Sequence, residues 1–156
     1  MKTLLPALAF LILLSACAGT AKLSDFSQTA SSVDFEKLSK EFKLAETPFW
    51  TTSASNEYYF EKDIVPDEET FIAIIKSSLE AHRYSISVSN PGEKCIIGKR
   101  GMQANEWSSI TAVYYKTDKK RLQVYIKTRI TQDITGGWKE NRAMKVGKLI
   151  EQKLQP

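Results

Sequence analysis

The stretch Leu122-Gln-Val-Tyr-Ile-Lys-Thr-Arg-Ile130 decides the fold, because apolar and polar residues alternate along its length. Such alternation is typical of a strand that turns one face to a core and the other to water. The wetter face would display Tyr125, Lys127 and Arg129. The stretch therefore predicts an antiparallel sheet with one covered face.

Further strands are expected upstream of this one. Residues 84–88 alternate apolar side chains with serines, and a turn signal of Asn, Pro and Gly separates them from the apolar run at residues 95–97. Residues 107–116 read as the strand before a polar turn at residues 117–120. We expect a three- to four-stranded antiparallel sheet.

Two helices flank the expected strands. Phe71, Ile75 and Leu79 form one apolar stripe behind an acidic helix start at residues 67–69. A second stripe predicts a helix from about residue 138 to residue 154. Because each helix has a single apolar surface to bury, we predict a compact α+β domain over residues 66–156, with its N-terminal and C-terminal helices packed on one face of the sheet.

The chain begins with a short apolar leader that ends in a cysteine. Lys2 precedes an apolar stretch from Leu4 to Leu14, which is too short for a stable membrane span. The ending Leu14-Ser-Ala-Cys17 resembles the signal of bacterial lipoproteins. We predict a signal peptide over residues 1–16 and lipidation at Cys17; the alternative is a plain secreted protein with a chance cysteine.

The resemblance to lipoproteins implies a location outside the cytoplasm. In such proteins the cysteine becomes the mature N-terminus and carries several acyl chains, such as palmitate. In the enterobacterial sorting scheme, aspartate after the cysteine favours the inner membrane. Ala18 stands there. This implies a lipid anchor at the periplasmic face of the outer membrane.

Two segments separate the anchor from the expected domain. Residues 17–33 are rich in Ala, Ser and Thr and predict a flexible tether. Residues 34–65 form an N-terminal extension, in which Phe35, Leu38 and Phe42 share one face of a short helix. This helix needs the domain or a partner to receive its apolar face.

Aromatic residues gather in the second half of this extension. They occur as Pro48-Phe-Trp50 and Tyr58-Tyr-Phe60, and the loose alternation around the second group fits an edge strand. Such a segment is either an early strand of the domain or an extension used in binding. We expect the early strand.

The residues that could carry chemistry are few. The chain has one His and two Cys, so with Cys17 acylated no set of metal ligands remains, and we expect neither a metal nor a cofactor. Cys95 lies in an apolar run and is expected to be a buried thiol. A nucleophile pair of Cys95 with His82 stays open, because their elements are neighbours. We predict that the protein is not an enzyme.

The surface predicts binding instead. The net charge of +4 is typical of ordinary solvation, and we expect no nucleic-acid partner. Tryptophans on connections either cover the core or anchor a partner. The candidate partner-binding residues are Trp107, Tyr125, Lys127, Arg129 and Trp138.

Two runs resemble a known kind of domain. The first spans Thr70 to Tyr84, before Ile86 and Val88. It is similar to the opening of the BamC-like helix-grip domain, found in the accessory lipoprotein of the outer-membrane β-barrel assembly machinery. The second, from Ile97 through the Asn-Glu-Trp-Ser-Ser stretch to Ser109, resembles uncharacterised small bacterial outer-membrane lipoproteins more closely.

This resemblance implies a membrane-anchored periplasmic lipoprotein that acts as a non-catalytic binding or accessory subunit of a cell-envelope complex. The expected partners are the membrane, through the lipid, and an envelope protein. Two alternatives stay open, a lipoprotein that binds peptidoglycan or another glycan, and an uncharacterised hydrolase.

Overall fold

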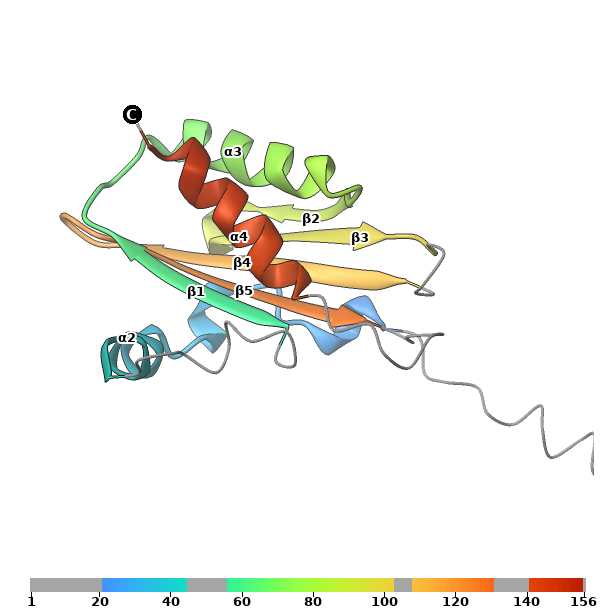
Figure 1. The fold of residues 1–156 in the computed structure, drawn as a ribbon, viewed down its shortest axis with the longest axis horizontal. Helices are drawn as coiled ribbons and strands as arrows, with labels where there is room; N and C mark the ends of the chain where they lie inside the picture. The colour runs from blue at the N-terminus through green and yellow to red at the C-terminus, as the bar shows by residue number, and fades with distance from the viewer. Residues whose placement is uncertain (1–20, 45–55, 103–107, 131–140, 156) are drawn as a thin grey trace, which may run out of the picture.

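The computed structural model describes residues 21–44, 56–102, 108–130 and 141–155. An antiparallel sheet of five strands lies at the centre, in the order β1-β5-β4-β3-β2 (Figure 1). The α+β class is confirmed, but the sheet has more strands than the expected three to four. The strands are β1 (Glu57–Lys62), β2 (Ser85–Asn90), β3 (Cys95–Arg100), β4 (Ser109–Thr117) and β5 (Leu122–Ile130).

The additional strand is β1, which contains the second aromatic group of the extension. β1 pairs with β5 along its whole length, with Tyr59 opposite Tyr125. Side chains alternate across a strand, so Tyr58 and Phe60 join the core on one face of the sheet, while Tyr59 joins a second core on the other face. The early-strand prediction is confirmed for residues 57–62; residues 45–55 lie outside the described part.

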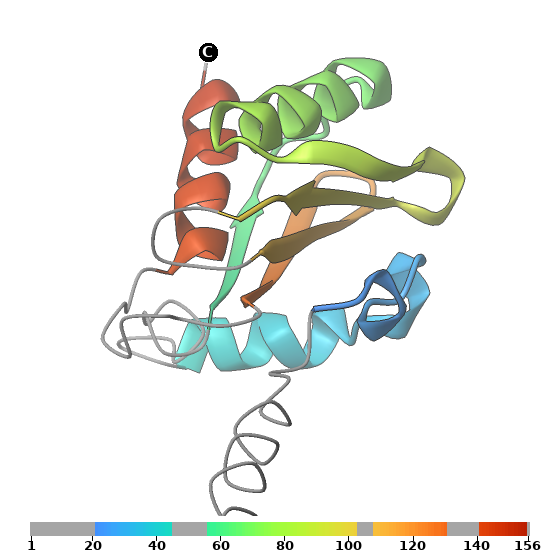
Figure 2. The same cartoon turned by 90° about the vertical axis from the view of Figure 1, so that its right-hand side faces the viewer.

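One face of the sheet is covered by α3 (Glu68–Ala81) and α4 (Arg142–Lys153) (Figure 2). The expected helix placement is incomplete, because a further helix packs on the other face. Asp67 and Asn141 cap these helices, because their side chains accept hydrogen bonds from backbone N–H groups of the first turn. Large apolar side chains fill the cluster beneath them. Its fully buried members include Phe71, Ile75, Leu79, Leu122, Val124 and Ile126.

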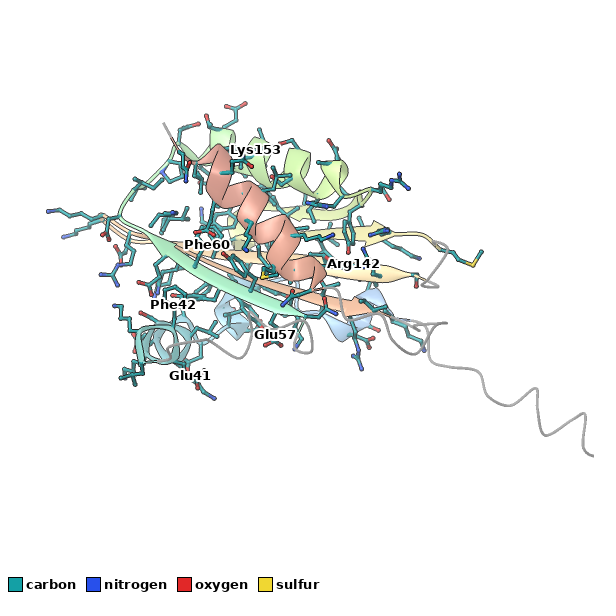
Figure 3. The ribbon with its side chains drawn as sticks, in the orientation of Figure 1. Glu41, Phe42, Glu57, Phe60, Arg142 and Lys153 are labelled. Atoms are coloured by element: carbon teal, nitrogen blue, oxygen red, sulfur yellow. The ribbon has the colours of Figure 1, made fainter. Side chains whose placement is uncertain are left out.

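The other face is covered by residues 21–44, here called the N-terminal segment. It consists of two 3-10 turns, Leu23–Asp25 and Ala30–Ser32, followed by α2 (Phe35–Leu44). Phe26 is 6% exposed and Phe35 is 4% exposed. Figure 3 shows Phe42 of α2 and Phe60 of β1 on opposite sides of the sheet.

The structure thus differs from the sequence expectation over residues 21–33. The composition predicts a tether, but this part of the chain packs on the sheet. A few apolar side chains are enough to pack this part of the chain, because the sheet presents an apolar surface beneath them. That surface comprises Tyr59, Cys95, Ile97, Ile110 and Ala112.

The edge strand β2 is irregular. Its register against β3 shifts between Ile86 and Val88, which is a β-bulge. Its outward-facing positions are serines, and none of its residues is fully buried. β2 therefore contributes less to the core than any other strand of the sheet.

Candidate functional site

The candidate binding residues of β5 lie on the face of the sheet that the N-terminal segment partly covers. The ring of Tyr125 is stacked on that of Tyr114, with centroids 6.1 Å apart and an interplanar angle of 19°. Lys127 Nζ lies 3.4 Å from Glu57 Oε1. Arg129 Nη1 lies 3.3 Å from Asp25 Oδ2 in the segment itself. Tyr125 is thus partly buried, whereas the side chains of Lys127 and Arg129 form ion pairs and stay 48% and 60% exposed.

Polar contacts fix the N-terminal segment to the sheet at Ser27. The Tyr114 hydroxyl donates a hydrogen bond to the Ser27 carbonyl oxygen at 2.8 Å. The Cys95 thiol points at the same oxygen, with a sulfur–oxygen distance of 3.7 Å. The segment is thus held to the sheet at this point through the backbone carbonyl of Ser27.

A second polar cluster holds α2 near β1. The Tyr59 hydroxyl donates to Glu61 Oε1 at 2.7 Å, and Gln123 Nε2 donates to the Tyr59 oxygen at 2.8 Å. Lys43 of α2 and Arg121 of the hairpin each lie within 4 Å of Glu61 Oε2. Burial acts to raise the pKa of Glu61, but hydrogen bonds and the Lys43 charge lower it overall, so the carboxylate stays ionised.

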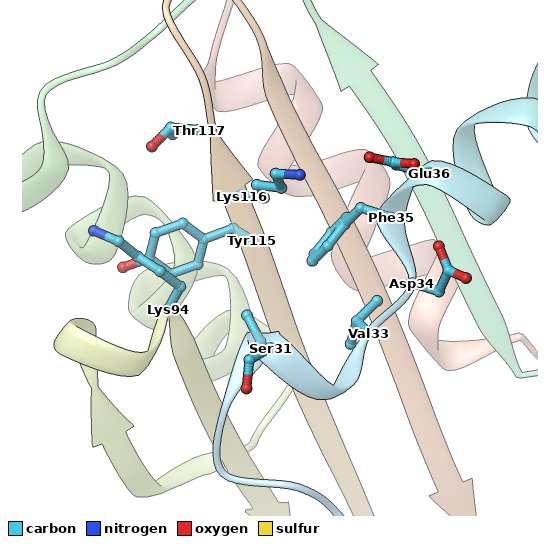
Figure 4. Close-up of a pocket in the computed structure, with 10 residues that line it drawn as sticks. Ser31, Val33, Asp34, Phe35, Glu36, Lys94, Tyr115, Lys116 and Thr117 are labelled. Carbon is cyan, nitrogen blue, oxygen red and sulfur yellow. The ribbon is translucent and has the colours of Figure 1, made fainter.

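Two hollows lie on either side of the N-terminal segment. The first, of about 420 Å³, lies between the segment and the end of β4; in Figure 4, Phe35 and Val33 border it on one side, and Lys94 and Tyr115 on the other. The second, of about 360 Å³, is floored by Tyr114 and Tyr125. Its rim carries charged side chains of both signs, namely Asp25, Asp34, Lys37, Glu41 and Lys127.

The side chains that line the second hollow indicate what kind of ligand would suit it. Burial raises the pKa values of Tyr114 and Tyr125 far above neutral pH, so both hydroxyls stay protonated. Aromatic rings flanked by charged groups suit a ligand with an apolar face and polar edges. The second hollow is therefore the better candidate for a small polar ligand.

The potential nucleophile pair of Cys95 with His82 is separated by the sheet. Cys95 is fully buried under the N-terminal segment, and burial raises its thiol pKa to about 12. His82 ends α3 on the other side, near Lys145 and Arg100, where burial and these charges lower its pKa. A buried, protonated thiol is inert, so the expectation for Cys95 is confirmed.

Several predicted features have no position in the described residues. Cys17, Trp107 and Trp138 lie outside them. Among the residues that the structure does describe, no group of His, Cys, Asp and Glu could hold a metal ion. No described helix has the length and hydrophobicity that a bilayer crossing requires.

Sequence reasoning missed the residues by which the N-terminal segment meets the sheet. Asp25 and Phe26 stand in a polar stretch, and only the spacing of Phe26, Ala30 and Phe35 signals that one side of it is apolar. Ser27 contributes a carbonyl oxygen, which no side-chain pattern reveals.

No protein-family model matches the chain, and no curated protein matches it. The resemblance to BamC-like domains stays a prediction from the residues that carry it.

Proposed function

We propose that the chain is a lipoprotein at the periplasmic face of the outer membrane, where it serves as a non-catalytic binding subunit of an envelope complex. The observation that carries this proposal is the leader ending in Leu14-Ser-Ala-Cys17, followed by Ala18. Two or more acyl chains give stable anchoring, because each buried methylene contributes about 0.8 kcal/mol.

The described part of the chain supports a binding role over turnover. The thiol of Cys95 and the imidazole of His82 face opposite sides of the sheet, and Glu61 is committed to ion pairs that hold α2. General acid–base or nucleophilic catalysis needs such groups within hydrogen-bond reach of each other. Two open hollows lie instead beside the N-terminal segment.

Fractionation of cells that express Cys17→Ser tests the anchor. We expect the variant in the soluble periplasmic fraction and the parent chain in the membrane fraction. Cys95→Ser is the matched control, because it removes the other thiol and should leave the protein in the membrane. A Cys17→Ser chain that stays in the membrane fraction would contradict the proposal.

A pull-down from detergent-solubilised envelope, with the acylated protein and a C-terminal tag, tests the binding role. We expect stoichiometric recovery of one membrane complex. Recovery of bulk lipid alone would argue against an accessory subunit. Hydrolysis of an envelope substrate that Cys95→Ala or His82→Ala abolishes would show an enzyme instead.

The second hollow favours glycan binding as an alternative function. Its floor of Tyr114 and Tyr125 and its charged rim resemble the surface on which a sugar ring stacks and forms hydrogen bonds. Co-sedimentation with purified peptidoglycan checks this, with Tyr125→Ala as the test and Ser24→Ala as the surface control. Equal sedimentation of the two variants would exclude the hollow as a glycan site.

A further inference from the structure

The proposed anchor at Cys17 would hold the domain close to the membrane. Cys17 precedes Ala21 by four residues, and the chain is packed on the sheet from this point onward. A fully extended chain gains at most about 3.6 Å per residue, so these residues reach about 14 Å. A lipid on Cys17 would therefore hold the Ala21 end of the domain close to the bilayer surface.

The Ala21 end can be located on the sheet. The ion pair of Asp25 with Arg129 places it beside the end of β5. Arg129 pairs with Ile110 in β4, and Ile110 pairs with Lys99 at the end of β3. Figure 1 shows the first, blue part of the chain near the arrowhead of β5, whereas the β4–β5 hairpin lies at the opposite end of the sheet.

The end of the sheet where β3 and β5 finish is rich in basic side chains, and we call it the basic end. It also includes the close of α3 and the start of α4, where Figure 3 labels Arg142; Lys153 lies at the other end of the same helix. The basic residues that define it are Lys22, Arg83, Lys99, Arg100 and Arg129; Arg142 lies behind them and is buried, at 7% exposed.

Together with burial, the positive charge at the basic end lowers the pKa of His82. Burial is the largest cause of the lowered His82 pKa, and the positive charges of Lys145, Arg100 and Arg142 lower it further. These charges come from β3 and α4, so they converge in space although they are far apart in sequence. The basic residues at this end are therefore close together in space, and not only frequent in the sequence.

Described acidic residues also lie at the basic end, and they are fewer than its described basic residues. Among the described residues, the basic end contains Asp25, Glu57 and Glu80. Asp25 and Glu57 are each used in an ion pair with a basic residue of β5. At the opposite end, the basic hairpin residues 119–121 stand near the acidic start of α3 and Asp63, so the two signs are mixed there.

One apolar side chain extends beyond the basic end. Met102 lies two residues after the end of β3 and is 71% exposed. Basic residues around an exposed apolar side chain are typical of surfaces that bind anionic lipid, where Lys and Arg meet phosphates and the apolar group enters the interface.

We infer that the basic end docks on the anionic phospholipid headgroups of the membrane that holds the Cys17 anchor. The inference rests on the lipidation proposed above. The length of the chain before Ala21 and the charge of the basic end lead to the same orientation independently. The hairpin at residues 118–121 then points away from the bilayer and is available to a partner.

Position-specific quenching on vesicles tests the orientation. The lipidated protein is labelled with a fluorophore at Met102→Cys or at Lys119→Cys; acylation blocks Cys17, and burial protects Cys95. The vesicles contain phosphatidylcholine with or without phosphatidylglycerol, and a headgroup quencher. We expect several-fold stronger quenching at position 102 than at position 119, with the preference increased by phosphatidylglycerol and reduced by salt.

A matched pair of charge reversals separates docking from non-specific attraction. Lys22→Glu with Lys99→Glu should remove the effect of phosphatidylglycerol on quenching at position 102. Lys119→Glu with Lys120→Glu changes the net charge equally and should leave that effect intact. A circular dichroism spectrum of each variant confirms that the fold is kept.

The outcomes distinguish the inference from the anchor proposal. If the lipidated protein does not float with vesicles, the anchor is wrong, and the orientation argument fails with it. If it floats but positions 102 and 119 are quenched equally, the anchor stands and the inference is overturned. An unchanged ratio with and without phosphatidylglycerol also overturns it, and makes an acidic protein the better occupant of the basic end.

Discussion

The two faces of the sheet are covered in different ways. On the helix face, α3 and α4 pack large apolar side chains such as Phe71 and Ile75 against β4 and β5. On the other face, the N-terminal segment buries fewer large apolar side chains, chiefly Phe26 and Phe35. It adds polar contacts at Ser27, Asp25 and Lys43. Burial of large apolar groups dominates folding stability. The helix face therefore stabilises the fold, while the second face can change locally.

The largest expected effect is a cavity on the helix face. Phe71 is fully buried and meets the Tyr115 ring edge-on at 5.1 Å. Phe71→Ala should reduce the free energy of unfolding by about 3–5 kcal/mol, measured by urea denaturation. Ile64→Ala, at an exposed position, is the control and should change it by less than about 0.5 kcal/mol. A small loss at Phe71 would mean that the helix face is not the stable one.

Added volume should also damage this face. A Cβ at Gly147 in α4 would lie 2.1 Å from Tyr58 Cδ1, so α4 crosses β1 at a distance that only glycine permits. Gly147→Ala should cost about 1–3 kcal/mol in thermal unfolding. Gly92→Ala is the matched control, because nothing lies within 4 Å of its Cβ. Equal melting temperatures for the two variants would contradict the close crossing.

The second face should open without global unfolding. Cys95 lies beneath Ser27 and is 0% exposed, so its reaction with a thiol reagent reports on the position of the segment. In a Cys17→Ser background, Phe26→Ala should accelerate this reaction at least about tenfold, which corresponds to about 1.4 kcal/mol of local opening. Phe26→Leu, which keeps most of the volume, should have a smaller effect.

The contrast between the faces would be lost if Phe26→Ala lowered the global free energy of unfolding as much as Phe71→Ala does. It would also be lost if both variants accelerated the reaction of Cys95 in proportion to that free energy.

The smallest expected effect concerns pH at the end of α3. Burial and neighbouring cations lower the His82 pKa in the folded state, so the unfolded chain binds the proton more tightly. This contribution to stability is complete above the ordinary pKa of about 6.5 and is lost as the pH falls through the folded value. His82→Gln should therefore show a smaller loss of melting temperature between neutral and mildly acidic pH. An unchanged pH dependence would contradict the assignment.

The sequence predicts the buried face of an element where the apolar pattern lies within that element. β5 alternates, and α3 has one apolar stripe, so each reveals its own buried face. β1 could not be assigned with equal clarity, because Tyr58, Tyr59 and Phe60 are consecutive aromatics and the strand is buried on both faces. A strand covered on both sides shows no alternation.

The candidate site was harder to predict for a related reason. Tyr125, Lys127 and Arg129 share one face of β5, but the partial burial of Tyr125 and the ion pair of Arg129 depend on the distant residues 21–44. The apolar residues of this segment are too few to suggest folding by themselves. Their burial depends on a complementary surface about 70 residues away in sequence, as the contact of Ser27 with Cys95 illustrates.

If the proposed anchor holds many copies on one membrane, the bulge in β2 has a consequence for how they meet. An edge strand offers unpaired N–H and C=O groups, and a neighbouring copy could add its own edge and begin a continuous aggregate. The register shift between Ile86 and Val88 interrupts that row, and the serines beside it keep the strand hydrated. Many copies can thus stand side by side without joining their sheets.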